Sequence, residues 1–135
     1  MTRGADYGAR GVIRLARAPQ GQIMLVSEIA AREGLPESYL AKIFQELARS
    51  GIVRSHRGAG GGFSLARPAE AITLRQIVEA IQGPLALNTC LDAGAANACD
   101  QVATCALYPV LQRAQQQLVS ILDETTLAEL VARGD

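Results

Sequence analysis

Three cysteines are the residues of this chain best suited to chemistry. They stand as Cys90-x8-Cys99-x5-Cys105 in a segment rich in Ala, Asn, Asp and Gly, which offers little apolar surface for burying three thiols separately. An odd number of cysteines leaves one thiol over if a disulfide forms, and structural disulfides are disfavoured in the cytosol, where we expect this chain to be. The spacing therefore indicates a metal or a cluster held by thiolates.

Zinc and an iron–sulfur cluster are the two candidates for this site. Structural zinc needs a fourth ligand and usually shows a C-x2-4-C pair, which is missing here. In an iron–sulfur cluster, three cysteines leave one iron for an oxygen, a nitrogen or an external ligand. The cysteines therefore favour a cluster, and a zinc site stays open.

Charge is distributed unevenly, although the formal net charge is zero. Residues 1–67 hold ten Lys/Arg and five Asp/Glu, whereas residues 68–135 hold three and eight. The stretch from Arg49 to Arg67 has four arginines, the only histidine (His56) and no acidic residue. This asymmetry predicts that the N-terminal half binds a polyanion while the other half has a different role.

Apolar periodicity and capping residues predict a mainly helical chain with one β-hairpin. Ser27 is expected to cap a helix, Gly34 to end it, and Pro36 to begin the next one. Thr73 and Gln76 predict a capping box. The expected elements are helices over 7–18, 28–33 and 36–50, strands over 52–56 and 63–65, and helices over 73–82, over 107–122 and from 126 onward.

Two helices joined by Gly34-Leu35-Pro36 and followed by a hairpin are typical of a winged helix-turn-helix. The expected fold is mainly α with a small β-hairpin wing and a long C-terminal dimerisation helix. The apolar stripe over 107–122 exceeds what so small a chain can cover, which predicts a homodimer. We expect a DNA-binding region at 1–84, a cysteine-rich cluster-binding loop at 85–106, and the dimerisation and C-terminal helices at 107–135.

Double-stranded DNA is the polyanion that this pattern favours. The helix from Pro36 is expected to enter a major groove, and the glycine-rich loop is expected to carry Arg57 toward a narrow minor groove, whose negative potential attracts guanidinium groups. Glycines in that loop allow a tight turn close to another backbone. The candidate DNA-binding residues are Ser27, Ser38, Tyr39, Lys42, Arg57, Gly58, Gly60 and Gly61.

Other functions fit the sequence less well. The glycine loop lacks the Gly-Lys-Ser/Thr end of a nucleotide-binding loop, and no Ser/His/Asp or Cys/His constellation indicates an enzyme. A winged-helix interaction module that reports on a metabolic enzyme stays an alternative. No run of about 18 apolar residues or apolar signal core is found, so we expect a cytoplasmic protein that does not associate with membranes.

Motifs along nearly the whole chain resemble one family. They are Asp6-Tyr7-Gly8-Ala9-Arg10, Ser38-Tyr39-Leu40, Arg57-Gly58-Ala59-Gly60-Gly61-Gly62-Phe63, the three cysteines, and Thr126-Leu127-Ala128-Glu129-Leu130. Together they resemble the Rrf2 family of winged-helix regulators, the group that contains IscR, NsrR and RirA. The resemblance implies a homodimer that pairs through its long C-terminal helix, binds a palindromic operator as a repressor, and changes its DNA affinity with the state of an iron–sulfur cluster.

The resemblance also bears on the fourth cluster ligand. Some members use an aspartate of helix 1 from the opposite subunit, and others use a histidine three residues after the last cysteine. The second position is Tyr108 here, and a phenol is an uncommon ligand, whereas Asp6 matches the aspartate. A 4Fe-4S cluster held by Cys90, Cys99, Cys105 and Asp6 is therefore favoured, a 2Fe-2S cluster stays open, and the signal is nitric oxide, iron or redox state. The alternative for Asp6 is an exposed acid that favours the helix dipole.

Overall fold

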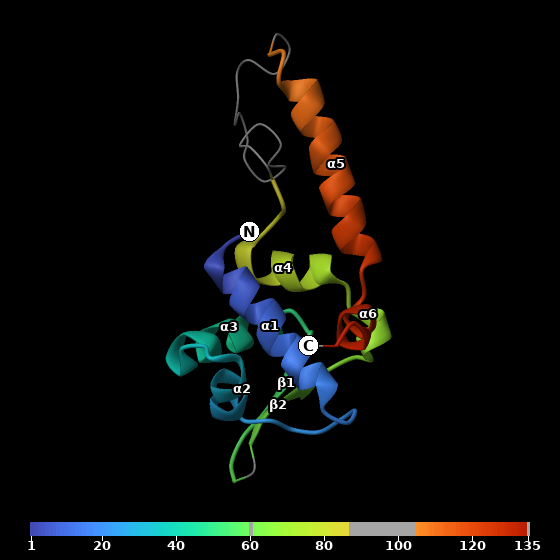
Figure 1. Ribbon diagram of the computed structural model, residues 1–135. Coiled ribbons are helices and arrows are strands. Elements are labelled where there is room, and N and C mark those ends of the chain that lie inside the picture. Colours follow the sequence, from blue (N-terminus) through green and yellow to red (C-terminus); the bar gives the residue numbers. More distant parts are fainter. Residues whose placement is uncertain (60, 87–104, 135) are drawn as a thin grey trace.

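The computed structural model describes residues 1–59, 61–86 and 105–134 (Figure 1). The helices in these ranges are α1 (Arg3–Arg17), α2 (Val26–Glu33), α3 (Glu37–Arg49), the short 3-10 helix η1 (Ala69–Ala71), α4 (Leu74–Gln82), α5 (Tyr108–Glu124) and α6 (Leu127–Ala132). Strands β1 (Val53–His56) and β2 (Gly62–Leu65) pair antiparallel as a hairpin. The expected fold class, mainly α with a β-hairpin wing, is confirmed.

One apolar core joins α1, α2, α3, α4 and the hairpin. Helix α3 buries the face that its periodicity predicts, namely Leu40, Ile43, Phe44 and Leu47. The ring of Phe44 meets Phe63 of β2 edge-to-face, with 5.2 Å between the ring centres. Because α3 is fixed on this side, its opposite side is left free for contacts outside the chain.

The helix starts show where local capping rules succeed and where they fail. The Thr73 capping box is confirmed, since Gln76 N–H donates to Thr73 Oγ1 at 3.1 Å and Thr73 N–H donates to Gln76 Oε1 at 3.0 Å. The prediction that Ser27 caps α2 is wrong, because α2 already begins at Val26. Its start is held instead by Glu28, whose Oε1 accepts a 3.1 Å hydrogen bond from the Leu25 N–H.

Helix α1 begins at Arg3 rather than near Tyr7, because Thr2 caps it: Thr2 Oγ1 accepts a 3.1 Å hydrogen bond from Ala5 N–H. The added first turn contains Asp6. It therefore places this candidate ligand on a rigid helix rather than in an extended arm.

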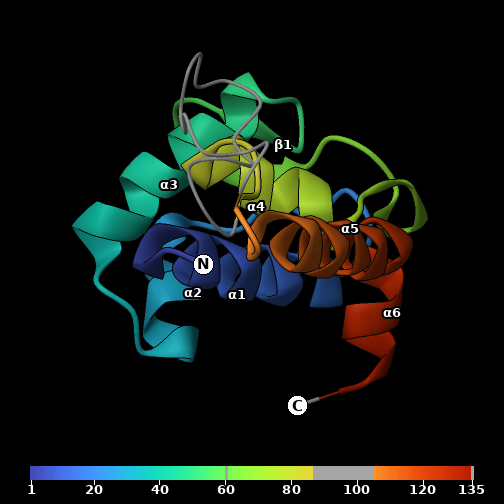
Figure 2. The ribbon, with the colours of Figure 1, turned by 90° about the horizontal axis from the view of Figure 1, so that it is seen from above.

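Helix α5 rises away from the winged domain, as Figure 1 shows, and its lower end is tied to α4. Leu74 N–H donates to Thr125 O at 2.9 Å, and Leu127 N–H donates to Ile72 O at 2.8 Å. Viewed from above, α5 stands over the side of the domain that carries α4 and α6, away from α3 (Figure 2). Leu127 of α6 is fully buried in the winged-domain core, so this end of the chain packs with the first part. The division into three regions stays a prediction.

Within the described ranges, no helix is long and apolar enough to cross a lipid bilayer.

Candidate nucleic-acid interface and cysteine segment

A tight turn sets α2 against α3 in the helix-turn-helix. Gly34 ends α2 in the left-handed conformation, with φ 67° and ψ 37°, and Pro36 precedes the first turn of α3. Leu35 N–H closes the turn on Ala30 O at 2.9 Å. This geometry leaves Ser38 and Lys42 exposed at the start and middle of α3, where a major groove could receive them.

Tyr39 is partly exposed on α3 and also contacts α1. Its side chain is 39% exposed, so it lies on the surface as expected of a DNA contact. Its ring also packs edge-to-face against Tyr7 of α1, with 5.7 Å between ring centres and 70° between ring planes. Periodicity could not find this contact, because Tyr7 and Tyr39 come from different helices.

A third segment pairs with strand β2 of the wing. Met24 N–H donates to Phe63 O and Phe63 N–H donates to Met24 O, both at 2.9 Å, so the apolar stretch before α2 pairs with β2. Gly62 lies at this crossing with φ +146°, and a Cβ there would overlap the Met24 carbonyl. Glycine is therefore required here by conformation and by space.

The wing carries exposed arginines on β1 and at its tip. Arg54 and Arg57 are exposed, Gly58 turns the chain at φ +85°, and a Cβ on Gly61 would lie 2.6 Å from the His56 carbonyl oxygen. Gly60, which the sequence also assigns to DNA binding, lies outside the described residues. No acidic residue occurs between Ser50 and Arg67, so the hairpin presents an uncompensated positive charge.

His56 has a structural role that the sequence did not reveal. Its Nε2 lies 2.8 Å from Ser64 Oγ, across the hairpin. Ser64 is the one buried polar side chain among the described residues, and it is 5% exposed. The hydrogen bond satisfies this buried hydroxyl and fixes the imidazole beside the wing arginines.

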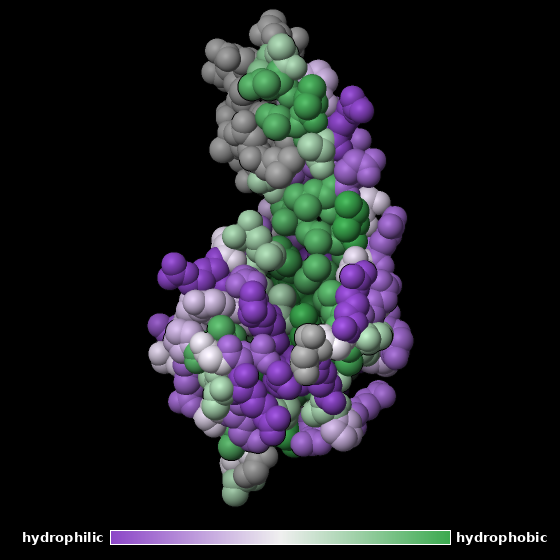
Figure 3. Space-filling model, viewed as in Figure 1, coloured by the Kyte–Doolittle hydropathy of each residue, from purple (hydrophilic) through white to green (hydrophobic). Residues whose placement is uncertain are grey.

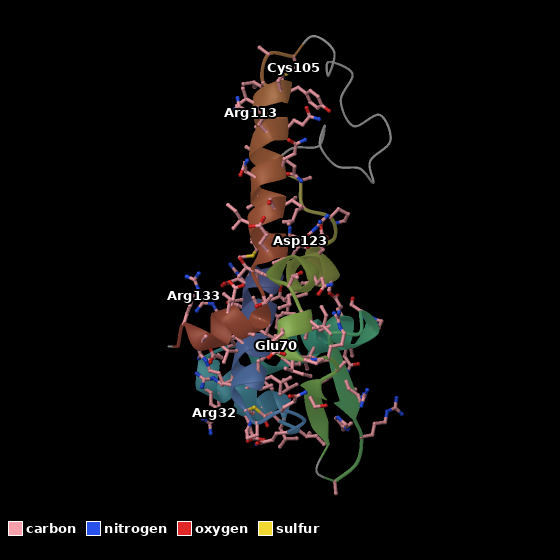
Figure 4. All side chains as sticks on the ribbon, turned by 90° about the vertical axis from the view of Figure 1, so that its right-hand side faces the viewer. Arg32, Glu70, Cys105, Arg113, Asp123 and Arg133 are labelled. Atoms are coloured by element: carbon pink, nitrogen blue, oxygen red, sulfur yellow. The ribbon has the colours of Figure 1, made fainter. Side chains whose placement is uncertain are left out.

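The cysteine segment is described only at its end. Cys105 is a free, half-buried thiol just before α5, whereas Cys90 and Cys99 lie outside the described residues. In the described ranges, no three His, Cys, Asp or Glu side chains gather as a metal site. Cys105 lies at the end of α5 that is remote from the winged domain (Figure 4).

Asp6 lies on the first turn of α1, 41% exposed, and its Oδ1 accepts a 3.1 Å ion-paired hydrogen bond from Arg10 Nε. Ala5, on the same turn, packs in a cluster with Val119 and Leu122 near the C-terminal end of α5, whereas Cys105 precedes the N-terminal end of this 17-residue helix, which is about 25 Å long at 1.5 Å per residue. Asp6 and Cys105 of one chain are therefore not brought together.

Helix α5 has two apolar sides. Val119 and Leu122 pack inward on a small cluster of Ala5, Val78 and Leu85. The outward side leaves Leu107, Val110 and Ile121 between 59% and 64% exposed. Figure 3 shows apolar side chains gathered along α5 and where α5 meets the domain. Large apolar side chains left in water along a helix are typical of a protein interface.

Known proteins match this chain along its whole length. Residues 1–133 match the model of the Rrf2 family, which is described as an iron-dependent transcriptional regulator. The chain belongs to the Rrf2 family. A proposed HTH-type transcriptional regulator of Mycobacterium tuberculosis (strain H37Rv) is 35% identical over 130 residues, which are 96% of this chain and 80% of the relative.

Two solved structures place the same fold in characterised regulators. CymR, the global cysteine regulator of B. subtilis, is 26% identical, with a TM-score of 0.79 over 100% of this chain and 98% of CymR. T. potens IscR is 25% identical, with a TM-score of 0.79 over 100% of this chain and 88% of IscR. This Rrf2 protein is thus a DNA-binding transcription regulator rather than an enzyme, as its sequence predicts, and regulators of its family act as dimers.

Proposed function

We propose that this Rrf2 protein is a cytoplasmic repressor whose homodimer binds a palindromic operator and whose DNA affinity is switched by an iron–sulfur cluster. The observation that carries the DNA-binding part is the joint exposure of Lys42 on α3 and of Arg54 and Arg57 on a wing without acids. Phosphate contacts by such residues give affinity, and a helix in the major groove gives register and sequence readout.

The donor set fits a cluster. Cys105 is a free, half-buried thiol that lies three residues before the start of α5, so it is placed beside a regular helix. Together with Cys90 and Cys99 it supplies three soft thiolates, which suit iron–sulfur chemistry. A 4Fe-4S cluster then needs one further ligand, and a 2Fe-2S cluster is the smaller alternative.

Asp6 of the partner subunit is our candidate for that ligand. In a single chain, Asp6 and Cys105 lie near opposite ends of α5. Rrf2 members with an aspartate ligand take it from the opposite subunit, and pairing of two chains through α5 would allow the same arrangement here. The cluster site would then join the two protomers, and its loss would change the spacing of the two DNA-reading heads without removing a DNA contact.

When bound, the cluster would supply reactivity toward nitric oxide or oxidants, or sensitivity to iron supply. The protein's own residues would set that reactivity. Cys90, Cys99 and Cys105 would hold the group through three soft thiolates, while the carboxylate of Asp6, which is paired with Arg10, would be the weaker ligand.

Anaerobic purification followed by absorption and Mössbauer spectroscopy tests the cluster directly. We expect iron and sulfide in the purified protein, loss of the cluster in Cys90→Ala, Cys99→Ala and Cys105→Ala, and altered cluster stability or nitric oxide reactivity in Asp6→Ala. Glu70→Ala, which removes an exposed acid from η1, is the matched control and should behave as wild type. Stoichiometric zinc without iron would overturn the cluster in favour of a zinc site. An Asp6→Ala protein identical to wild type in spectra, reactivity and DNA binding would remove Asp6 from the ligand set.

A further inference from the structure

One turn of α1, from Gly4 to Gly8, touches both the DNA-reading helix and the helix that leads to the cysteines. A Cβ on Gly4 would lie 3.1 Å from Tyr39 Oη of α3 and 3.3 Å from Ile81 Cγ2 of α4. A Cβ on Gly8 would overlap Ile81 Cδ1 and lie 3.0 Å from Ile43 Cγ2. These glycines let α3 and α4 approach the backbone of α1 closely, so the three helices are tightly packed here.

The same turn is tied to the start of the cysteine segment. Thr2 N–H donates to Gln82 Oε1 at 2.9 Å, which joins the start of α1 to the last residue of α4. Ala5 is fully buried against Leu85. The backbone of Leu85 is held on both sides, because its N–H donates to Glu79 Oε2 at 3.1 Å and its carbonyl accepts from Gln115 of α5. A shift of the chain just before the cysteines therefore reaches the first turn of α1 through packed and hydrogen-bonded groups.

On α3, the residue that contacts this turn of α1 is Tyr39. Its hydroxyl lies over Gly4, and its ring lies against Tyr7. A surface cavity of about 290 Å³ opens beside these contacts, lined in part by Tyr39, Lys42, Ile81 and Gln82. Close packing on one side and open space on the other give Tyr39 room for a second position, which a two-state transmission element needs.

We propose that Tyr39 is a positioning residue: through its contacts with Gly4 and Tyr7, the first turns of α1 set the angle of α3, and the state of the cysteine segment is passed to DNA affinity by this route. The link to the cysteine segment rests on the proposed function. The control of α3 by α1 is independent of the proposed function, because it depends only on the contacts of Gly4, Tyr7 and Tyr39. The two parts can therefore be tested separately.

The control of α3 is tested with cluster-free protein by a double-mutant cycle. Gly4→Ala adds a Cβ that forces Tyr39 or Ile81 to move by a few tenths of an ångström, and alanine favours the helix by about 1 kcal/mol, so the variant should fold. We expect operator affinity to fall about five- to tenfold with an unchanged salt slope, because α3 is tilted while no phosphate contact is removed. In a Tyr39→Phe background, which lacks the obstructing hydroxyl, Gly4→Ala should cost less than about twofold.

The role of Tyr39 would be overturned if Gly4→Ala lowered operator affinity equally in the wild-type and Tyr39→Phe backgrounds. It would also be overturned if Gly4→Ala kept the wild-type operator affinity. A reduced salt slope would also overturn it, since the loss would then come from a missing phosphate contact.

The link to the cysteine segment is tested by the ratio of operator affinities with and without the cluster. Tyr7→Leu should bring this ratio close to one while the cluster spectrum and the dimer stay as in wild type. Tyr7→Phe keeps the edge-to-face ring and should keep the ratio. Ile13→Ala trims a partly buried side chain elsewhere on α1 and should lower stability without changing the ratio.

A Tyr7→Leu protein that keeps the wild-type ratio would refute this route. A wild-type protein without a cluster, or with a ratio of one, would refute the proposed function and with it the link to the cysteines, whereas the double-mutant cycle would still decide the role of Tyr39.

Discussion

Replacing two outward side chains of α5 should separate the dimer. Val110 and Ile121 are 60% and 59% exposed in the single chain, and they lie three turns apart on the outward side of α5. We choose Val110→Gln together with Ile121→Gln, because glutamine keeps the helix propensity of this position while removing its apolar character. The double variant therefore changes the interface and leaves the helix.

The expected loss follows from the exposed fractions. Fully burying a Val or Ile side chain contributes about 1.5–3 kcal/mol, so burying the exposed three-fifths contributes about 1–1.8 kcal/mol. A two-fold symmetric dimer buries each residue twice, which makes four side chains and about 4–7 kcal/mol of association free energy. Since 1.4 kcal/mol corresponds to a factor of ten, the dimer Kd should rise by roughly three to five powers of ten.

Sedimentation equilibrium over a concentration series measures this Kd, and a gel-shift titration measures the effect on operator binding. Wild type should be dimeric and the double variant monomeric at the same micromolar concentration, with weak operator binding because the half-sites are then bound one at a time. Gln112→Ala with Gln116→Ala, on the exposed polar side of α5, is the matched control. A double variant that sediments as wild type would place the interface outside this side of α5.

Three further predictions concern the winged domain. Leu127→Ala should lower the free energy of unfolding by about 2–5 kcal/mol in chemical denaturation, because Leu127 is fully buried; an effect no larger than that of the partly exposed Leu130→Ala would show that α6 is not part of the core. His56→Ala should destabilise by about 1–3 kcal/mol by leaving the buried Ser64 hydroxyl unsatisfied, and less in a Ser64→Ala background; strictly additive effects in thermal melts would contradict the hydrogen bond. Arg57→Ala should weaken operator binding by about 1–3 kcal/mol, and a gel-shift titration with wild-type affinity would remove Arg57 from the DNA contacts.

Local features of the sequence determined much of the fold. Three- and four-residue spacing of apolar side chains identified the buried face of α3, because helical geometry alone puts such residues on one side. The caps Thr73 and Thr126 fixed the starts of α4 and α6, because a cap bonds to a backbone N–H only three residues away. The glycine-rich loop located the hairpin in the sequence, because a tight turn depends on the conformation of only a few neighbouring residues.

The sequence also indicated the chemistry of the cysteines, whereas the fourth ligand was suggested only by the resemblance to a family. Three thiols in a polar segment are a compositional signal that needs no fold. Which carboxylate could approach them is a different question, because it depends on the length and direction of α5, which keeps Asp6 and Cys105 of one chain apart.

The contacts that join the parts became visible only in the folded chain. Tyr39 meets Tyr7, His56 meets Ser64, and Leu127 closes a core built by helices much earlier in the chain. Each of these contacts joins residues from different elements, and either partner alone looks like an ordinary surface or core residue. Their pairing follows from how the helices and the hairpin pack together. This packing depends on the shape of the whole core, so the periodicity of the sequence does not predict it.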